Sequence, residues 1–168
     1  MSLTPVADPE NAPEGAPYAA LSRLGLSLPP PRPPVANFVP AVIEGDLVFL
    51  SGQGPIGPEG LVHRGKVGAE LSVDQGYAAA RLTTLNLLSA IEQVVGSLNR
   101  VRKVIKVLGM VNAAADFSAH PMVINGCSDL LIKVFGPDIG AHARSAVGMG
   151  SLPGQIAVEI EMIVAINH

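Results

Sequence analysis

Hydrophobic and polar residues alternate through the last quarter of the chain, which is the pattern of a strand with one buried face. Between 156 and 166 one face carries Ile156, Val158, Ile160, Met162 and Val164, and the other carries Ala157, Glu159, Glu161 and Ile163. A shorter run at 143–147 comes before it, and the Gly- and Pro-containing segment between the two runs predicts a loop. We therefore expect a strand, a loop and a strand, with the two carboxylates facing away from the core.

Apolar residues at steps of three and four predict two long helices earlier in the chain. The first spans 72–96, with Ser72 as its N-cap and Gly96 as its stop signal. The second begins at a cap, Asp116 or Ser118, and ends near residue 135. The residues expected to be buried are Tyr77, Ala80, Thr84, Leu88, Ile91 and Val95 on the first helix, and Val123, Cys127, Leu130 and Val134 on the second.

Two apolar runs, at 37–43 and 47–51, and an alternating run at 101–111 predict three further strands. The residues 44–46, Glu-Gly-Asp, are suited to a hairpin loop between the first two. The turn-rich segment 52–60 lacks the ending of a phosphate-binding loop. The order of elements predicts an α+β domain with a mixed, mostly antiparallel sheet and two helices on one face.

The beginning of the chain has a different character. A short helix is expected at 17–26, ended by Gly25, and the proline-rich tract 27–35 must be extended because each proline fixes φ and lacks a donor. We therefore predict that residues 1–35 form an N-terminal extension with a short helix and a proline-rich connector. Residues 36–168 would form one globular domain.

Composition adds two expectations. Only 15% of the residues are charged and 48% are hydrophobic, which is thin polar cover for a monomer and predicts apolar surface buried between subunits. The formal net charge is −3 at pH 7. Because phosphate binding needs clustered cations, a nucleic-acid partner is not expected.

The single cysteine, Cys127, cannot form an internal disulfide, and it is interpreted as a small core residue in a cytoplasmic protein. The N-terminal sequence lacks the features of a signal peptide, and no uncharged apolar run is long enough to span a membrane. The four histidines have no metal-binding spacing, so neither a metal nor another cofactor is expected. They are His63, His120, His142 and His168.

Arg144 stands among small and apolar residues in the run 143–147, where a permanently charged guanidinium needs a partner. Glu159 or Glu161 could supply it, as a structural ion pair between strands. Alternatively, the planar guanidinium could hold a small carboxylic acid. His142 points to the same strand face as Arg144 and could border such a pocket, whereas Ser145 points to the opposite face.

These C-terminal residues resemble the signature of a known family. The order Arg144-Ser145-Ala146-Val147, Leu152-Pro153, Val158-Glu159-Ile160-Glu161 is similar to that of the RidA/YjgF family of reactive-intermediate (enamine/imine) deaminases, also labelled L-PSP endoribonucleases. Leu50-Ser51-Gly52-Gln53 is similar to the family's Ser-Gly-Gln segment. The resemblance covers roughly 35–166. It implies a chorismate-mutase-like fold and a homotrimer, with three sheets around a central barrel and ligand pockets at the subunit clefts.

The resemblance also implies roles for individual residues. Arg144 would hold the carboxylate of a 2-imino acid, and Glu159 would orient the attacking water. Substrate binding would use an apolar wall, the asparagine of the second helix and two backbone contacts, at Phe38, Asn125, Gly52 and Ala146 respectively.

Two positions depart from the deaminating members, which commonly have Cys at the place of Ala146 and Glu at the place of Gly148. With the N-terminal extension, these departures indicate a divergent branch. The expected function is hydrolysis of enamine or imine intermediates to 2-oxo acids and ammonia. The alternatives are a non-catalytic protein that binds small carboxylates through Arg144, and the endoribonuclease of the family label, which the acidic charge and the 4% aromatic content disfavour.

Overall fold

The computed structural model describes residues 17–31 and 36–167. The elements along the chain are α1 (Pro17–Arg23), β1 (Ala41–Glu44), β2 (Leu47–Gln53), β3 (Ile56–Gly57), β4 (Gly60–Leu61), α2 (Val73–Val95), η2 (Leu98–Arg100), β5 (Val101–Asn112), α3 (His120–Gly140), β6 (Ala143–Met149), η3 (Pro153–Gln155) and β7 (Val158–Ile166). Residues 1–16, 32–35 and 168 lie outside the described part, and with them much of the predicted extension.

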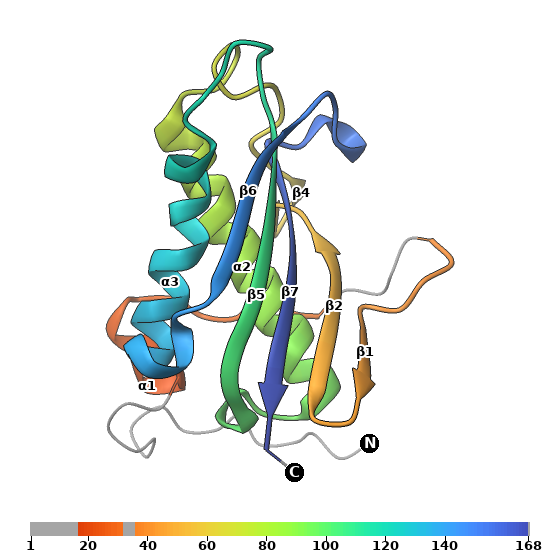
Figure 1. Cartoon of the computed structure of the whole chain (residues 1–168), viewed down its shortest axis with the longest axis vertical. Helices are drawn as coiled ribbons and strands as arrows, with labels where there is room; N and C mark the ends of the chain where they lie inside the picture. The colour runs from red at the N-terminus through yellow and green to blue at the C-terminus, as the bar shows by residue number, and fades with distance from the viewer. Residues whose placement is uncertain (1–16, 32–35, 168) are drawn as a thin grey trace.

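Five strands form one sheet in the order β1-β2-β7-β5-β6. Only β5 and β6 are parallel, because α3 carries the chain back between them, and the other three pairings are antiparallel. Figure 1 shows α2 and α3 side by side behind the sheet, with the other face open. The predicted mixed, mostly antiparallel sheet with two long helices on one face is confirmed.

The alternation of β7 determines which face is buried. Val158, Ile160, Met162 and Val164 are each at most 1% exposed and lie under the helices. Glu159 and Glu161 lie on the open face, as the sequence predicts. The open face also carries exposed Phe49 and Val147. It is therefore a partly apolar surface within the described chain.

Helix α2 begins and ends where its sequence signals predict. The Ser72 side chain accepts a hydrogen bond from the Gln75 backbone, the Gln75 side chain accepts one from the Ser72 backbone, and together they form a capping box. Gly96 ends the helix with φ 86°, a left-handed conformation that costs glycine little.

The predicted start of the second long helix is wrong. Neither Asp116 nor Ser118 caps α3: its N-cap is Ala119, which makes no side-chain capping bond. Pro121 occupies the first turn, and because proline has no N–H, one fewer donor there needs an acceptor. At the other end Gly136 has non-helical φ and ψ, so the regular helix stops close to the predicted residue 135.

Close packing holds α3 against both α2 and the sheet. A Cβ at Gly126 would lie 2.1 Å from the carbonyl oxygen of Tyr77, and a Cβ at Gly109 would lie 2.6 Å from the Ile124 side chain. Both glycines therefore permit contacts that any other residue would block. The result is that the middle of α3 packs directly on α2 and on β5.

The described part of the N-terminal region packs on the domain. Leu21 of α1 is part of the hydrophobic core. The Tyr18 hydroxyl donates to Glu92 Oε1 at 2.6 Å and accepts from the Leu98 backbone N–H at 2.9 Å. Burial and the hydrogen bond to Glu92 raise the pKa of Tyr18. The following extended segment is held by Ser89, whose hydroxyl donates to the Pro29 carbonyl.

Two boundaries differ from the sequence expectation. The first strand of the sheet begins at Ala41 rather than at residue 37, and the residues before it are bends. The segment 52–60, expected to be turn-rich, contains the short hairpin β3–β4. The side-chain amide of Asn86 on α2 donates to the Gly54 and Ile56 carbonyls, which fixes this hairpin against the helix.

Candidate functional site

Arg144 projects from β6 towards α3, on the helix-covered side of the sheet. Its Nη1 donates to Asn125 Oδ1 at 2.8 Å and to Ser128 Oγ at 3.0 Å, and Nη2 donates to the Pro121 carbonyl at 3.5 Å. All three acceptors are uncharged. In the described part of the chain Arg144 has no carboxylate partner, so its charge remains available to an anionic ligand.

The helix positions both polar partners of Arg144. Asn125 and Ser128 are three residues apart on α3 and so lie on one face of the helix. Asn125 was predicted from the sequence as a substrate-binding residue. Ser128 was not predicted, although its spacing from Asn125 was a signal that could have found it.

His142 completes this cluster from the loop before β6. Its Nδ1 is 2.7 Å from the Gly140 carbonyl oxygen, and its Nε2 is 3.0 Å from Ser128 Oγ. Burial lowers the pKa of His142, the positive charges of Arg144 and Lys103 lower it further, and the hydrogen bond to Gly140 acts in the opposite direction. The prediction that His142 shares a face with Arg144 is confirmed. We call Asn125, Ser128, His142 and Arg144 the Arg144 cluster.

Glu159 and Gly52 form a second group on the open face. A Cβ on Gly52 would lie 2.1 Å from Glu159 Oε1, so the carboxylate rests in the space that glycine leaves empty. The register of β2 against β7 shifts between Leu50 and Gln53, which marks an irregularity at Gly52. Burial raises the pKa of Glu159, and the neighbouring Glu161 raises it further.

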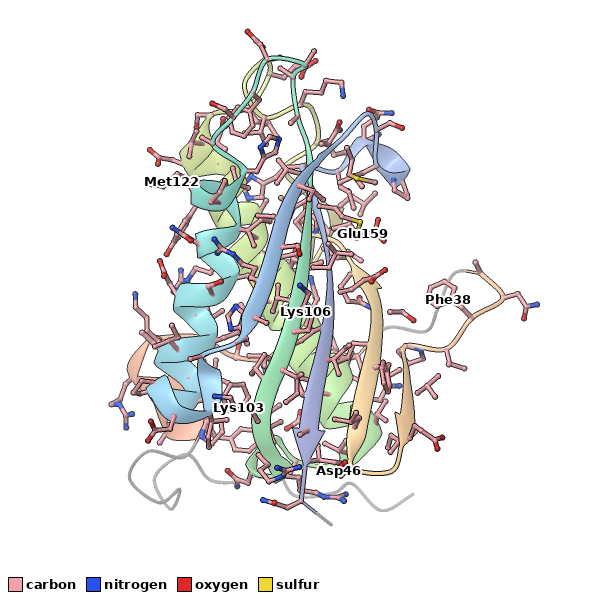
Figure 2. The ribbon with its side chains drawn as sticks, in the orientation of Figure 1. Phe38, Asp46, Lys103, Lys106, Met122 and Glu159 are labelled. Atoms are coloured by element: carbon pink, nitrogen blue, oxygen red, sulfur yellow. The ribbon has the colours of Figure 1, made fainter. Side chains whose placement is uncertain are left out.

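Phe38 lies closer to this second group than to Arg144. It is 44% exposed, in the bend before β1, where Figure 2 shows it outside the edge of the sheet. Val39 follows Phe38 in this bend. The Ser51 hydroxyl donates a hydrogen bond to the Val39 carbonyl at 2.7 Å, which connects the bend to β2. Glu159, Gly52 and Phe38 together are here called the Glu159 group.

Arg144 and Glu159 do not meet within one chain. They belong to β6 and β7, which lie on either side of β5 and are therefore about 10 Å apart. Arg144 is in register with the buried Val107, and Glu159 is in register with Met110, which faces the opposite side of β5. The interpretation of Arg144 as half of an ion pair with Glu159 or Glu161 is therefore wrong.

Ala146 and Gly148, the two positions that depart from the deaminating members, are both covered by other parts of the chain. Both lie on the same face of β6 as Arg144, and Ala146 packs against the core. A Cβ at Gly148 would lie 2.5 Å from Nε2 of His120, so an imidazole at the start of α3 covers this position. The Phe117 ring contacts the same imidazole edge-on, with the centroids 5.1 Å apart.

Other possible chemistry has less support in the described residues. Burial raises the pKa of Cys127 to about 12, which makes it a core thiol, as predicted. No group of three or more His, Cys, Asp or Glu residues among those described is arranged to hold a metal ion. None of the described helices is both long and apolar enough to cross a membrane.

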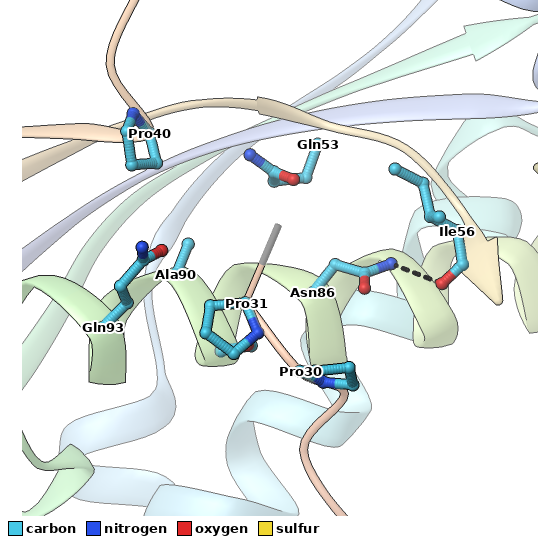
Figure 3. A pocket seen from close by; sticks show the side chains of 9 residues that line it. Pro30, Pro31, Pro40, Gln53, Ile56, Asn86, Ala90 and Gln93 are labelled. Carbon is cyan, nitrogen blue, oxygen red and sulfur yellow. Dashed lines mark hydrogen bonds between the residues drawn. The ribbon is translucent and has the colours of Figure 1, made fainter. Parts of the chain in front are cut away.

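A small cleft lies between α2 and the proline-rich segment (Figure 3). Pro30 and Pro31 form one wall, and Gln53 and Asn86 contribute polar atoms. The Asn86 amide is already bonded to backbone carbonyls. The cleft contains none of the predicted site residues, and we assign it a structural role.

Sequence comparison places these features among known proteins. Residues 19–158 match the family model described as YjgF/chorismate mutase-like, putative endoribonuclease. Protein TCP17 of Trypanosoma cruzi is 41% identical over 150 residues, which cover 89% of this chain and 94% of that protein.

Structural comparison gives the same result. Atu1372 of Agrobacterium tumefaciens, described as of unknown function, superposes with a TM-score of 0.82 at 38% identity, over 89% of this chain and 91% of its own. A protein of Shewanella oneidensis MR-1, described as a putative endoribonuclease, gives a TM-score of 0.87 at 31% identity, over 90% and 99%. RidA of Psychrobacter sp. PAMC 21119 gives 0.53 at 27% identity, over 82% and 94%. The predicted chorismate-mutase-like fold is confirmed.

Proposed function

This chain belongs to the YjgF/chorismate mutase-like family, and from that premise we propose that it hydrolyses reactive enamine and imine intermediates, in particular 2-imino acids, to 2-oxo acids and ammonia. The observation that carries the proposal is the state of Arg144. Its guanidinium is held by Asn125, Ser128 and a backbone carbonyl, all of them neutral. A positioned cation without an anionic partner suits the carboxylate of such a substrate.

The proposed chemistry needs a bound carboxylate and a positioned water. An enamine first takes up a proton from solvent on carbon to become the iminium ion (the protonated imine), whose carbon is electrophilic. Glu159 accepts a proton from water as the water oxygen bonds to that carbon, which gives a carbinolamine. Glu159 passes this proton to nitrogen and then takes up the hydroxyl proton as the C–N bond breaks, which releases ammonia and leaves the carbonyl. The raised pKa of Glu159 brings this base closer to neutral pH, where general bases work best.

The site is proposed to form between two protomers. The Arg144 cluster and the Glu159 group are on opposite faces of one sheet. Because β6 is an edge strand, Arg144 lies at the edge of the sheet, where a second protomer could approach it. The open face, with exposed Phe49 and Val147, offers apolar surface for a neighbour. We propose a homotrimer in which Arg144 and Asn125 of one protomer face Glu159, Gly52 and Phe38 of the next.

The test is ammonia release from 2-aminoacrylate, which a dehydratase acting on serine generates in the cuvette. Wild type should accelerate release, and Arg144→Ala should abolish the acceleration while the oligomer and the melting temperature stay the same. Undiminished acceleration by an Arg144→Ala oligomer would refute the proposal.

Because the one cysteine is a buried free thiol, we propose a cytoplasmic location.

One observation favours the second candidate, a non-catalytic protein that binds small carboxylates. His120 covers Gly148, where deaminating members commonly have Glu, so the polar lining of the site differs. Saturable binding of a 2-oxo acid that depends on Arg144, without any ammonia release, would select this alternative. Both candidates use the same cation.

A further inference from the structure

The hydrogen bonds around His142 have a defined direction. The Gly140 carbonyl can only accept, so His142 Nδ1 carries a hydrogen. In the neutral ring Nε2 then has a lone pair, and the Ser128 hydroxyl donates to it. The oxygen of the same hydroxyl accepts from Arg144 Nη1. The three hydrogen bonds therefore run in one direction, from the Arg144 guanidinium through Ser128 and His142 to the Gly140 carbonyl.

A proton on His142 reverses one link of this chain. The imidazolium must donate through Nε2, and the nearest acceptor is the Ser128 oxygen, which already accepts from Arg144. Two cations would then converge on one hydroxyl group, separated by two hydrogen bonds of 3.0 Å each. In the unliganded protein this arrangement is unfavourable and disfavours protonation of the ring.

The charged groups that act on His142 are both positive. Arg144 approaches from β6 and Lys103 from β5, while α3 contributes the neutral Ser128 hydroxyl and Gly140 carbonyl. Among the described residues no carboxylate contributes to the shift of its pKa. An anion on the exposed side of Arg144 would therefore be the counter-charge that His142 lacks.

We propose that the Arg144 cluster takes up a small carboxylate together with a proton, which His142 accepts and Ser128 couples to the guanidinium. The inference rests on the proposed function, because it uses the same anion site. An anion that neutralises Arg144 makes the proton on His142 more favourable, and by linkage the proton strengthens anion binding by the same factor. His142 is thus a positioning residue that makes carboxylate affinity rise as the pH falls.

The experiment uses the full-length oligomer and 2-oxobutanoate as the probe. Its dissociation constant is measured by calorimetry from pH 8 to pH 5.5, and the His142 ring is titrated by NMR with and without the probe. In wild type we expect affinity to rise about fivefold or more across this range, and saturating probe to raise the pKa of His142. In His142→Gln, whose side-chain oxygen can still accept from Ser128, we expect the rise to be largely lost while binding persists.

Matched variants separate this coupling from other titrations. His63→Asn replaces an imidazole away from the cluster, at a residue with φ 52° that asparagine tolerates, and should keep the wild-type dependence. Any dependence left in His142→Gln belongs to other groups, Glu159 first among them. A His142→Gln protein with the full wild-type rise, or a His142 titration that saturating probe does not move, would overturn the proposal.

A measurement without ligand distinguishes failure of the inference from failure of the proposed function. Arg144→Gln removes the cation beside Ser128, and the pKa of His142 should then rise. If wild type binds no 2-oxobutanoate, the proposed function fails for this probe, and the Arg144→Gln titration still decides whether the relay exists. An unmoved His142 in that variant would overturn the relay whatever the ligand result.

Discussion

The carboxylate of Glu159 occupies the space that a side chain at Gly52 would need. The two residues are on adjacent strands, and an ideal Cβ at position 52 would lie 2.1 Å from Glu159 Oε1. The glycine is thus required by a close approach of a functional group and not by its backbone angles. This relationship explains physically why a glycine belongs to the proposed site.

Replacing Gly52 should damage activity more than stability. In Gly52→Ala the new methyl group must displace the end of a flexible side chain, which costs little folding free energy but moves the proposed base. We expect ammonia release to fall at least about tenfold, since small displacements of catalytic groups have large effects, with a melting temperature within a few degrees of wild type. Gly150→Ala is the matched control, because nothing lies within 4 Å of the added Cβ. Equal activities of the two variants would contradict this role of Gly52.

Arg144 and Glu159 are separated by β5 and lie on opposite faces of the sheet, which makes a site between protomers testable by mixing. Arg144→Ala and Glu159→Gln should each be inactive alone. Refolded together in equal amounts, they should recover about a quarter of the wild-type activity, the fraction of interfaces that pair two intact halves in a closed cyclic oligomer.

The control for mixing is each inactive variant refolded with itself and assayed at the same total concentration. Size-exclusion chromatography should give the same oligomer for all samples. If the two variants mix into one oligomer and no activity returns, the composite site is wrong.

The pH dependence should report on the pair Glu159 and Glu161. Burial and the Glu161 charge raise the pKa of Glu159, and a general base must be deprotonated, so kcat/KM should fall as the pH drops through that raised value. Glu161→Gln removes one of the two causes. The acid-side fall of the profile should therefore move to lower pH in this variant.

Glu44→Gln is the comparison for that experiment, since it removes a carboxylate from the exposed edge strand β1. It should leave the acid limb where wild type has it. An acid limb that stays fixed in Glu161→Gln would mean that another group controls it.

The sequence predicted which face of the sheet a residue lies on better than it predicted which strands lie side by side. Alternation along β7 depends only on local residues, and Glu159 and Glu161 lie on the open face as expected. Strand order depends on long-range packing. Because α3 returns the chain to lie parallel beside β5, β6 is on the outer edge and β7 pairs on the other side of β5. The structure therefore has contacts of Arg144 with α3 in place of the ion pair with Glu159 or Glu161 that the sequence suggested.

The same distinction applies to the candidate site. His142 and Asn125 were recognised, from strand parity and from the family resemblance respectively. The spacing of Ser128 from Asn125 puts both on one helix face, but the role of Ser128 comes from lying between Arg144 and His142, which only the tertiary fold brings together. Likewise, the contact of His120 with Gly148 joins the start of α3 to β6, and no local pattern predicts it.

Tyr18 connects the N-terminal helix α1 to the domain through two hydrogen bonds of its hydroxyl group. Its hydroxyl accepts from the Leu98 backbone N–H at 2.9 Å and donates to Glu92 at 2.6 Å. Leu98 is fully buried. Removing the hydroxyl therefore leaves a backbone donor without this acceptor in a place that water reaches poorly.

Tyr18→Phe should cost about 1–3 kcal/mol of unfolding free energy, the range for an unsatisfied buried polar group. Urea unfolding at one fixed protein concentration measures it, because the stability of an oligomer depends on concentration. Tyr77→Phe is the matched control: its hydroxyl donates to Asp129 at an exposed position, so its loss should stay below about 1 kcal/mol. Similar losses in both variants would show that the Tyr18 hydroxyl contributes no more than a surface hydrogen bond. A selective loss in Tyr18→Phe, with ammonia release unchanged, would show that α1 stabilises the domain without forming part of the site.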